Sequence, residues 1–147
     1  MAEAFYSVVL DHPAEAVWSA IRPFGHYAWA GVEAETVIEE GRADTEVGAV
    51  RCVRMPVRTI RQKLLAHSDR ERSYTYSFLE PAPVRNYVAT IRVTPVAETG
   101  QAFVDWRARF DCAPDECERW LDQFEQKGFA VWLAALRRFL GPEETRT

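Results

Sequence analysis

Arg51 is the residue whose type and position point most directly to chemistry. The segment 47–55 alternates with period two, which places Arg51 beside Val53 and Met55 on the dry face of a predicted strand. A buried guanidinium needs a partner, because an unpaired buried charge costs several kcal/mol. No Asp or Glu falls on the inner face of any predicted strand. One hypothesis is therefore that Arg51 binds an acidic ligand group, a carboxylate or phenolate, in a bidentate way.

Other polar residues leave alternatives open. Arg51 has a structural alternative, in which it lies at an open end and extends to water or pairs with Asp122 or Glu125. Tyr76 and Tyr87 fall on the same inner face, where a phenol donates a hydrogen bond to a carbonyl or acts as a weak acid. Their alternative is ordinary aromatic packing with a satisfied hydroxyl.

Histidines and cysteines form no recognisable catalytic or metal-binding pattern. The three histidines are scattered, and alternation places His67 on the wet face of its strand. The three cysteines, Cys52, Cys112 and Cys117, include no CxxC pair and predict no disulfide framework and no zinc site. Cys112 and Cys117 are five residues apart and could lie near each other at a helix start, but we interpret all three as small buried residues. There is no glycine-rich phosphate loop. We expect no metal and no cofactor.

The elements that position these residues are mostly strands. Alternating segments separated by turn signals predict strands over about 5–11, 32–40, 47–55, 58–67, 72–79, 86–96 and 102–112. The later segments have one apolar and one polar face. This is typical of an antiparallel sheet that is covered on a single side.

Helices complete the predicted fold. One begins at Pro13 and stops before Pro23, and a short helix or turn covers 26–30. A helix of about 26 residues begins at Pro114 and stops before Gly141. Its apolar stripe comprises Leu121, Phe124, Gly128, Val131, Trp132, Ala135, Leu136 and Phe139. The class is α+β with the order β-α-α-β6-α, a seven-stranded curved antiparallel sheet around a long C-terminal helix.

A ligand-binding wall follows from this arrangement. Its predicted members share the inner face of the sheet or the facing side of the helix: Arg51, Val53, Met55, Gln62, Leu64, Tyr76, Phe78, Tyr87, Ala89, Ile91, Trp106, Ala108, Phe110, Phe124, Gly128 and Trp132. Glycine inside a helix costs about 1 kcal/mol relative to alanine. Gly128 therefore indicates room for a ligand or for a large side chain such as Trp106. Plain core packing is the alternative for the whole set. Trp29 and Trp120 are expected near the mouth.

Bulk composition restricts the class of protein. The chain has 147 residues, enough for one domain over 1–147, with 48% hydrophobic and 27% charged residues. Its 22 acidic and 18 basic residues give a net charge of −4, which does not favour nucleic-acid binding. No apolar run approaches the roughly 20 residues of a membrane span, and the N-terminus is not typical of a signal peptide. We expect a cytoplasmic protein without membrane insertion, as a monomer or homodimer.

Several short segments, taken in order, carry a family resemblance. They are Val8–Trp18, Val47–Arg51, Leu64 with Asp69 and Arg72, Tyr76, Asn86-Tyr87, and Trp106 with Phe110. Together they resemble the START-like helix-grip superfamily (SRPBCC), in particular its polyketide cyclase/dehydrase-type branch. The resemblance implies an internal cavity between the concave sheet and the long helix, in which such proteins hold a ligand. It specifies fold more than function.

Three functions remain open at this point. The first is binding or carriage of a hydrophobic small molecule, lipid- or polyketide-like and with an acidic group as one option. The second is a polyketide cyclase, aromatase or dehydratase that shapes its substrate and polarises a carbonyl with Arg51 and a tyrosine. The absence of an inner His, Asp or Glu counts against that enzyme. The third is a partner-binding domain with a filled core.

Overall fold

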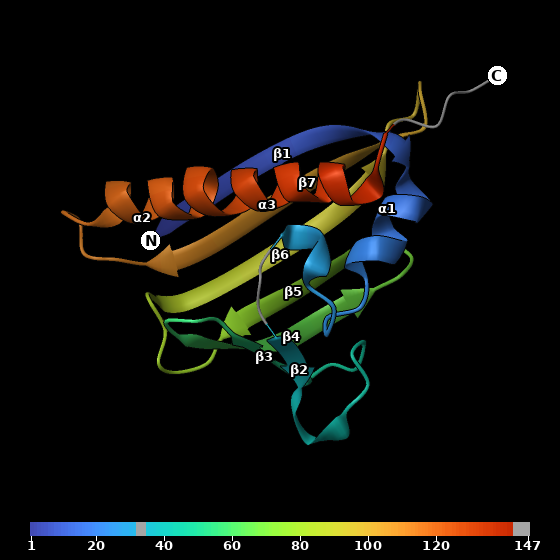
Figure 1. The fold of residues 1–147 in the computed structure, drawn as a ribbon. Coiled ribbons are helices and arrows are strands. Elements are labelled where there is room, and N and C mark those ends of the chain that lie inside the picture. The colour runs from blue at the N-terminus through green and yellow to red at the C-terminus, as the bar shows by residue number, and fades with distance from the viewer. Residues whose placement is uncertain (32–34, 143–147) are drawn as a thin grey trace.

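The computed structural model describes residues 1–31 and 35–142. Seven strands form one antiparallel sheet in the order β1-β7-β6-β5-β4-β3-β2 (Figure 1). The strands are β1 Ala2–Pro13, β2 Glu35–Ile38, β3 Val50–Arg54, β4 Thr59–Ser68, β5 Ser73–Phe78, β6 Arg85–Pro95 and β7 Gln101–Asp111. Each overlaps a strand predicted from the sequence, although the start of the segment 32–40 lies outside the described residues. The predicted α+β class is confirmed.

Helical elements follow the predicted order as well. They are α1 Ala14–Ile21, the 3-10 turns η1 Ala28–Ala30 and η2 Glu39–Gly41, and a continuous C-terminal helix made of α2 Cys117–Phe124, the π-helical turn η3 Glu125–Phe129 and α3 Ala130–Leu140. Gly31 ends η1 with a φ of +70°, a conformation that glycine adopts without a steric penalty. The C-terminal helix begins later than predicted, because Pro114–Glu116 forms a turn instead of a first helical turn.

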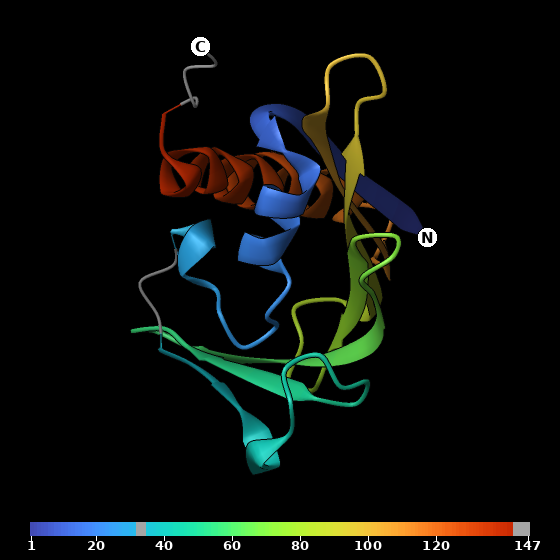
Figure 2. The same cartoon turned by 90° about the vertical axis from the view of Figure 1, so that its right-hand side faces the viewer.

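The sheet is strongly bent, and the helices lie on its concave face. Figure 2 shows β1, β7, β6 and β5 standing on one side of the molecule, with β4, β3 and β2 curving beneath. The C-terminal helix crosses this concave face, and α1 and η1 lie inside the bend. One side of the sheet is therefore covered, as the alternating sequence pattern predicts.

Burial confirms the predicted faces of the later strands. Along β6, Tyr87, Ala89, Ile91 and Val93 are buried. The pairing of β6 with β7 places buried residues opposite one another, since Ala89 lies opposite Ala108 and Ile91 lies opposite Trp106. Directly opposed residues of an antiparallel pair project to the same side. Residues from neighbouring strands therefore form continuous rows across the concave face.

His67 is placed on the opposite face from the one predicted. The pairing of β4 with β5 shifts between Leu64 and Ala66, which marks a β-bulge. A bulge inserts one residue and inverts the alternation that follows it. His67 therefore projects inward, opposite Tyr74 and with its ring centroid 5.5 Å from that of Trp18, while Ala66 is exposed.

The predicted apolar stripe of the C-terminal helix is partly wrong, since Ala135 and Leu136 are buried as predicted but two other members are exposed. Val131 and Phe139 are 51% and 49% exposed, whereas Phe129 and Leu133 are fully buried. The π-helical turn η3 is the cause, because its i→i+5 hydrogen bonding adds one residue to the turn. The inward face moves by one position relative to a regular α-helix. Sequence periodicity alone assumes 3.6 residues per turn and misses this displacement.

Cys112 and Cys117 form a disulfide bond, contrary to the interpretation as separate buried residues. The chain reverses between the end of β7 and the start of α2, where the amide of Glu116 donates a hydrogen bond to the carbonyl of Ala113. This turn brings the two Cα atoms to 5.5 Å, a typical separation for a disulfide. The bond ties the first turn of the C-terminal helix to the sheet.

None of the described helices combines the length and the apolar character that crossing a bilayer requires.

Candidate ligand-binding site

A pocket of about 640 Å³ opens between the bent end of the sheet and the C-terminal helix, and we call it the inner pocket. Its wall comes from four segments: Tyr27 before η1; Val53, Met55, Arg58, Thr59, Ile60 and Gln62 of β3, β4 and their connection; Phe78 at the end of β5 with Pro81, Ala82 and Pro83 of the connection that follows; and Trp120, Gln123, Phe124, Lys127, Gly128 and Trp132 of the helix. Volumes of this size are usual for small-molecule sites.

The remainder of the concave face is filled with aromatic side chains. Trp29, Trp106 and Phe129 are fully buried, and the rings of Trp106 and Phe129 stack at a centroid distance of 4.7 Å. The indole nitrogen of Trp106 donates a hydrogen bond of 3.1 Å to the hydroxyl of Tyr76. Close packing of this kind leaves no space for a ligand at that end. The inner pocket is consequently confined to the other end.

The structure brings seven of the sixteen predicted wall residues to the inner pocket. These seven are Val53, Met55, Gln62, Phe78, Phe124, Gly128 and Trp132. The other predicted members are buried in the core and do not line the inner pocket: Arg51, Leu64, Tyr76, Tyr87, Ala89, Ile91, Trp106, Ala108 and Phe110. Their inward orientation agrees with the alternation, but other side chains lie between them and the open space. Tyr87, for example, packs behind Phe78 and Phe124 of the wall.

Several wall residues were not predicted from the sequence. Tyr27, Arg58 and the segment Pro81–Pro83 belong to connections, where alternation carries no information about which side chain faces inward. Thr59 is the first residue of β4. The two prolines around Ala82 are a usable signal, because a rigid connection at a sheet end often borders a site. Trp120 lines the inner pocket as expected, whereas Trp29 is fully buried and not at the mouth.

Arg51 is fully buried, which removes the alternative that it extends to water. Its Nε donates a hydrogen bond of 2.8 Å to Oε1 of Gln62, and its Nη1 donates one of 3.4 Å to the carbonyl of Phe24. The guanidinium carbon lies 4.1 Å from the ring centroid of Phe24 and 4.2 Å from that of Tyr27. Such cation–π contacts partly replace water around the charge. No carboxylate of the described residues contacts Arg51.

Two polar atoms near this cluster remain unpartnered. Nη2 of Arg51 and the hydroxyl of Tyr74 are both sealed from solvent without a hydrogen bond to any described residue. Burial works against the charged form of Arg51, but the surrounding phenol groups, Tyr74 first among them, outweigh it and raise the pKa of the guanidinium. Burial also raises the pKa of Tyr27 well above its usual value, although the charge of Arg51 opposes this. Arg51 is therefore a permanent cation, and Tyr27 is a neutral phenol.

The helix wall owes its shape to Gly128. A Cβ at this position would lie 3.3 Å from the carbonyl oxygen of Gln123 and 3.3 Å from the Trp132 ring. The π-helical turn brings that carbonyl close, so only glycine fits there without displacing a neighbour. The absence of a side chain leaves the Trp132 ring as the surface of the pocket at this point.

The mouth of the inner pocket carries positive charge. Arg58 and Lys127 are exposed and line the wall from opposite sides, one from the β3–β4 connection and one from the helix. Among the described lining residues there is no carboxylate, histidine or cysteine. Lys127 has only a loose ion pair, with Asp122 at 3.8 Å. The wall is thus apolar inside, with two cations at its edge.

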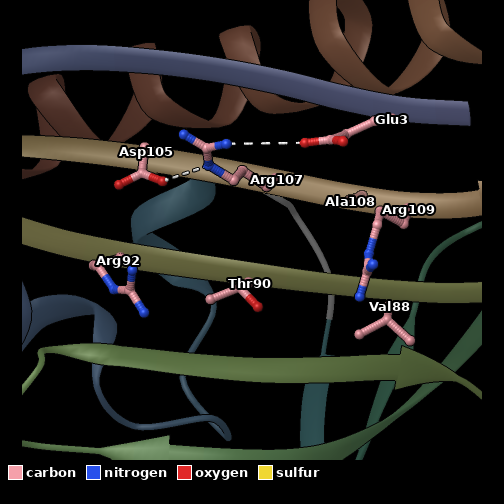
Figure 3. A pocket seen from close by; sticks show the side chains of 8 residues that line it. All are labelled: Glu3, Val88, Thr90, Arg92, Asp105, Arg107, Ala108 and Arg109. Atoms are coloured by element: carbon pink, nitrogen blue, oxygen red, sulfur yellow. Dashed lines mark hydrogen bonds and ion pairs between the residues drawn. The ribbon is translucent and has the colours of Figure 1, made fainter.

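A second, smaller hollow of about 220 Å³ lies on the outer face of β6 and β7 (Figure 3). Its charges largely neutralise one another: the guanidinium of Arg107 lies 3.2 Å from Asp105 and 3.8 Å from Glu3. Figure 3 shows Arg92 and Arg109 on the same open face. Because this surface is polar and solvated, the inner pocket is the better candidate for a small apolar ligand.

Comparisons with solved structures support the architecture. The chain is similar to a protein of Nitrosospira multiformis, with 27% identity over 99% of this chain and 100% of the other and a TM-score of 0.82. A protein of Thermobifida fusca gives 27% identity, coverage of 100% and 98%, and a TM-score of 0.83. Norcoclaurine synthase of Thalictrum flavum, solved in complex with dopamine and hydroxybenzaldehyde, shares the fold at 13% identity, with coverage of 99% and 89% and a TM-score of 0.74.

The sequence comparisons identify the family. No curated protein matches the chain significantly. A family model described as polyketide cyclase/dehydrase and lipid transport matches residues 1–141, nearly the whole sequence. This match confirms the resemblance predicted from the sequence, and the chain belongs to the polyketide cyclase/dehydrase and lipid transport family.

Proposed function

We propose that the protein binds or carries a hydrophobic small molecule, lipid- or polyketide-like, in the inner pocket. The observation that carries this proposal is the pocket itself: about 640 Å³ of space walled by aromatic, aliphatic and proline side chains in a domain whose other half is tightly filled. Each Å² of apolar surface removed from water contributes roughly 25 cal/mol, so an apolar ligand gains from entering it. Membership in a family described by polyketide chemistry and lipid transport supports the same ligand class.

Binding is better supported than a cyclase reaction at the same place. General acid–base chemistry needs a group that exchanges a proton near neutral pH. The described wall residues supply no carboxylate or histidine, and burial keeps Tyr27 protonated. Tyr27 and Gln62 are suited to holding a ligand by hydrogen bonds, which is a binding role.

Uptake of the neutral fluorescent probe N-phenyl-1-naphthylamine tests the proposal. Ala82 lines the inner pocket from the β5–β6 connection, so Ala82→Trp should fill part of the space and weaken uptake at least tenfold. Ala97→Trp is the matched control, because Ala97 is exposed in the β6–β7 connection and should leave uptake unchanged. Trp120 and Trp132 line the pocket, and quenching of their fluorescence gives a second readout.

Native mass spectrometry of the freshly purified protein should precede this titration. A co-purified apolar molecule would support the proposal and identify its chemical class. If the protein is empty and takes up no probe, or if it takes up the probe but Ala82→Trp and Ala97→Trp change the uptake equally, the proposal is wrong, and a protein-interaction role becomes the better explanation.

A further inference from the structure

We infer that Arg51 is a positioning residue that fixes the side-chain amide of Gln62, so that the amide NH₂ group faces the inner pocket and binds an oxygen acceptor of the ligand. The inference rests on the proposed function and specifies the ligand further. It concerns two residues of neighbouring strands, since Arg51 of β3 lies directly opposite Gln62 of β4.

The chemistry of the pair determines which way the amide points. A guanidinium has five N–H donors and no acceptor, whereas a glutamine amide has one oxygen acceptor and one NH₂ donor. Nε of Arg51 lies 2.8 Å from Oε1 of Gln62. The reversed amide would place donor against donor and forfeit this charge-assisted bond. The oxygen therefore faces Arg51, and the nitrogen is directed elsewhere.

The anchor is rigid. Arg51 is 0% exposed, and its guanidinium carbon lies against the rings of Phe24 and Tyr27, with a further hydrogen bond to the backbone of Phe24. Because these contacts fix the Arg51 guanidinium, it cannot move with the Gln62 side chain if that side chain rotates. The Gln62 amide is consequently held in one orientation before any ligand arrives, which lowers the entropic cost of binding.

The Gln62 nitrogen is available to a ligand. Gln62 lines the inner pocket, and its Nε2 makes no hydrogen bond to any described residue. It is also not one of the side-chain polar atoms that are sealed from solvent and unpartnered. Two N–H donors thus remain open on a wall that Val53 and Tyr27 otherwise make largely apolar.

This arrangement selects a class of ligand. A site with a fixed donor favours a molecule that carries a carbonyl or another oxygen acceptor over an analogue that lacks it, because an apolar group there leaves the donor unpaired. Arg51 itself does not line the inner pocket, so its influence on the ligand passes through Gln62. The ligand is then an apolar body with an oxygen acceptor at the end that reaches β3 and β4.

A pair of nearly isosteric probes tests the inference: 2-acetylnaphthalene and 2-ethylnaphthalene differ by a carbonyl oxygen. Their affinities are measured by displacement of N-phenyl-1-naphthylamine, and the ratio of the two is compared between variants. Gln62→Glu keeps the size of the side chain but removes the donors, and should lower the preference for the acetyl compound by about threefold to tenfold. Gln126→Glu makes the same change at an exposed position of the C-terminal helix that does not line the inner pocket, and should leave the ratio unchanged.

Arg51→Met supplies the second variant. It removes the anchor while preserving an apolar chain of similar length, so the amide turns freely and the acetyl preference should fall. A role of Arg51 in folding alone would change stability but not this ratio. An unchanged ratio in Gln62→Glu or in Arg51→Met, with both naphthalenes still bound, overturns the inference and leaves the proposed function standing. If neither naphthalene nor the probe binds, both are overturned.

Discussion

The two ends of the concave face differ in what covers them. At the filled end, the segment with α1 and η1 inserts Phe24 against Tyr74 and Tyr76. It also inserts Trp29 against Trp106, on which Phe129 of the C-terminal helix stacks. At the open end, short connections such as Pro81–Pro83 reach the helix without filling the gap. The same sheet therefore serves as a core at one end and as a binding wall at the other.

The largest difference between the two ends is expected in stability. Phe129 and Phe124 lie one helical turn apart, but Phe129 stacks on Trp106 in the filled end while Phe124 borders the inner pocket. Phe129→Ala should lower the free energy of unfolding by about 3–5 kcal/mol, because it opens a new void among packed rings. Phe124→Ala should cost less, because one side of its ring already faces open space. Chemical denaturation of both variants measures this.

Equal losses in the two variants would contradict the comparison. They would mean that the side chains in the wall of the inner pocket are packed as tightly as those of the filled end. A larger loss for Phe124→Ala would place the principal core at the open end and remove the basis for a ligand site there.

The accuracy of the sequence-based predictions differs between the regular and the irregular parts of the molecule. Alternation correctly orients Tyr87, Ala89 and Trp106, because period two is a property of the strand backbone itself. It fails after the bulge at Leu64, where one inserted residue reverses His67. Regular elements were therefore predictable, and local irregularities were not.

The candidate site was less predictable than the fold. Seven of the predicted wall residues line the inner pocket, but Arg51 and Tyr76 are covered by side chains of the irregular segment before η1, such as Phe24, and the path of that segment has no periodic signal. The π-helical turn moves the inward face of the C-terminal helix by one position, and the sequence periodicity does not predict this either. The orientation of the Gln62 amide depends on a contact across strands, which no single segment encodes.

One pH-dependent effect on stability is expected at the filled end. Asp69, after β4, accepts hydrogen bonds from Arg22 and from the Trp18 indole, which ties α1 to the sheet. The hydrogen bond from Arg22, followed by that from Trp18, holds the pKa of this carboxyl far below its ordinary value. Because the pKa of Asp69 is lower in the folded protein than in the unfolded chain, its ionised carboxylate stabilises the fold at any pH above the unfolded-state pKa of about 3.9. This stabilisation is lost as the pH falls from there toward the folded-state pKa. Because Asp69 is half exposed, solvent screens the effect.

Melting temperatures between pH 7 and pH 2 test this assignment. The melting temperature of the wild type should fall below about pH 4. Asp69→Asn should melt at a lower temperature than the wild type at pH 7, and its melting temperature should fall less between pH 4 and pH 2. Asp122→Asn is the control, since Asp122 lies on the exposed side of the C-terminal helix, 3.8 Å from Lys127. If the melting temperature of Asp69→Asn falls as much at low pH as that of the wild type, the hydrogen bonds of Asp69 to Arg22 and Trp18 contribute nothing to holding α1.

The smallest effect concerns the charges at the mouth of the open end. Arg58 and Lys127 should favour ligands with an anionic group that stays at the surface while the apolar part enters. The anionic probe 1-anilinonaphthalene-8-sulfonate and the neutral N-phenyl-1-naphthylamine share their aromatic part and differ in the sulfonate. Replacing both cations by alanine should weaken the anionic probe about twofold to fivefold, since exposed charge pairs contribute about 0.2–1 kcal/mol.

The neutral probe should be unaffected by the same double replacement, and added salt should reduce the difference between the two probes. Arg54→Ala provides the control, because Arg54 is exposed on β3 but does not line the inner pocket. Equal weakening of both probes would mean that the cations shape the mouth and do not attract charge. The open end would then select ligands by their apolar body and by the Gln62 donor alone, without any contribution from an anionic group.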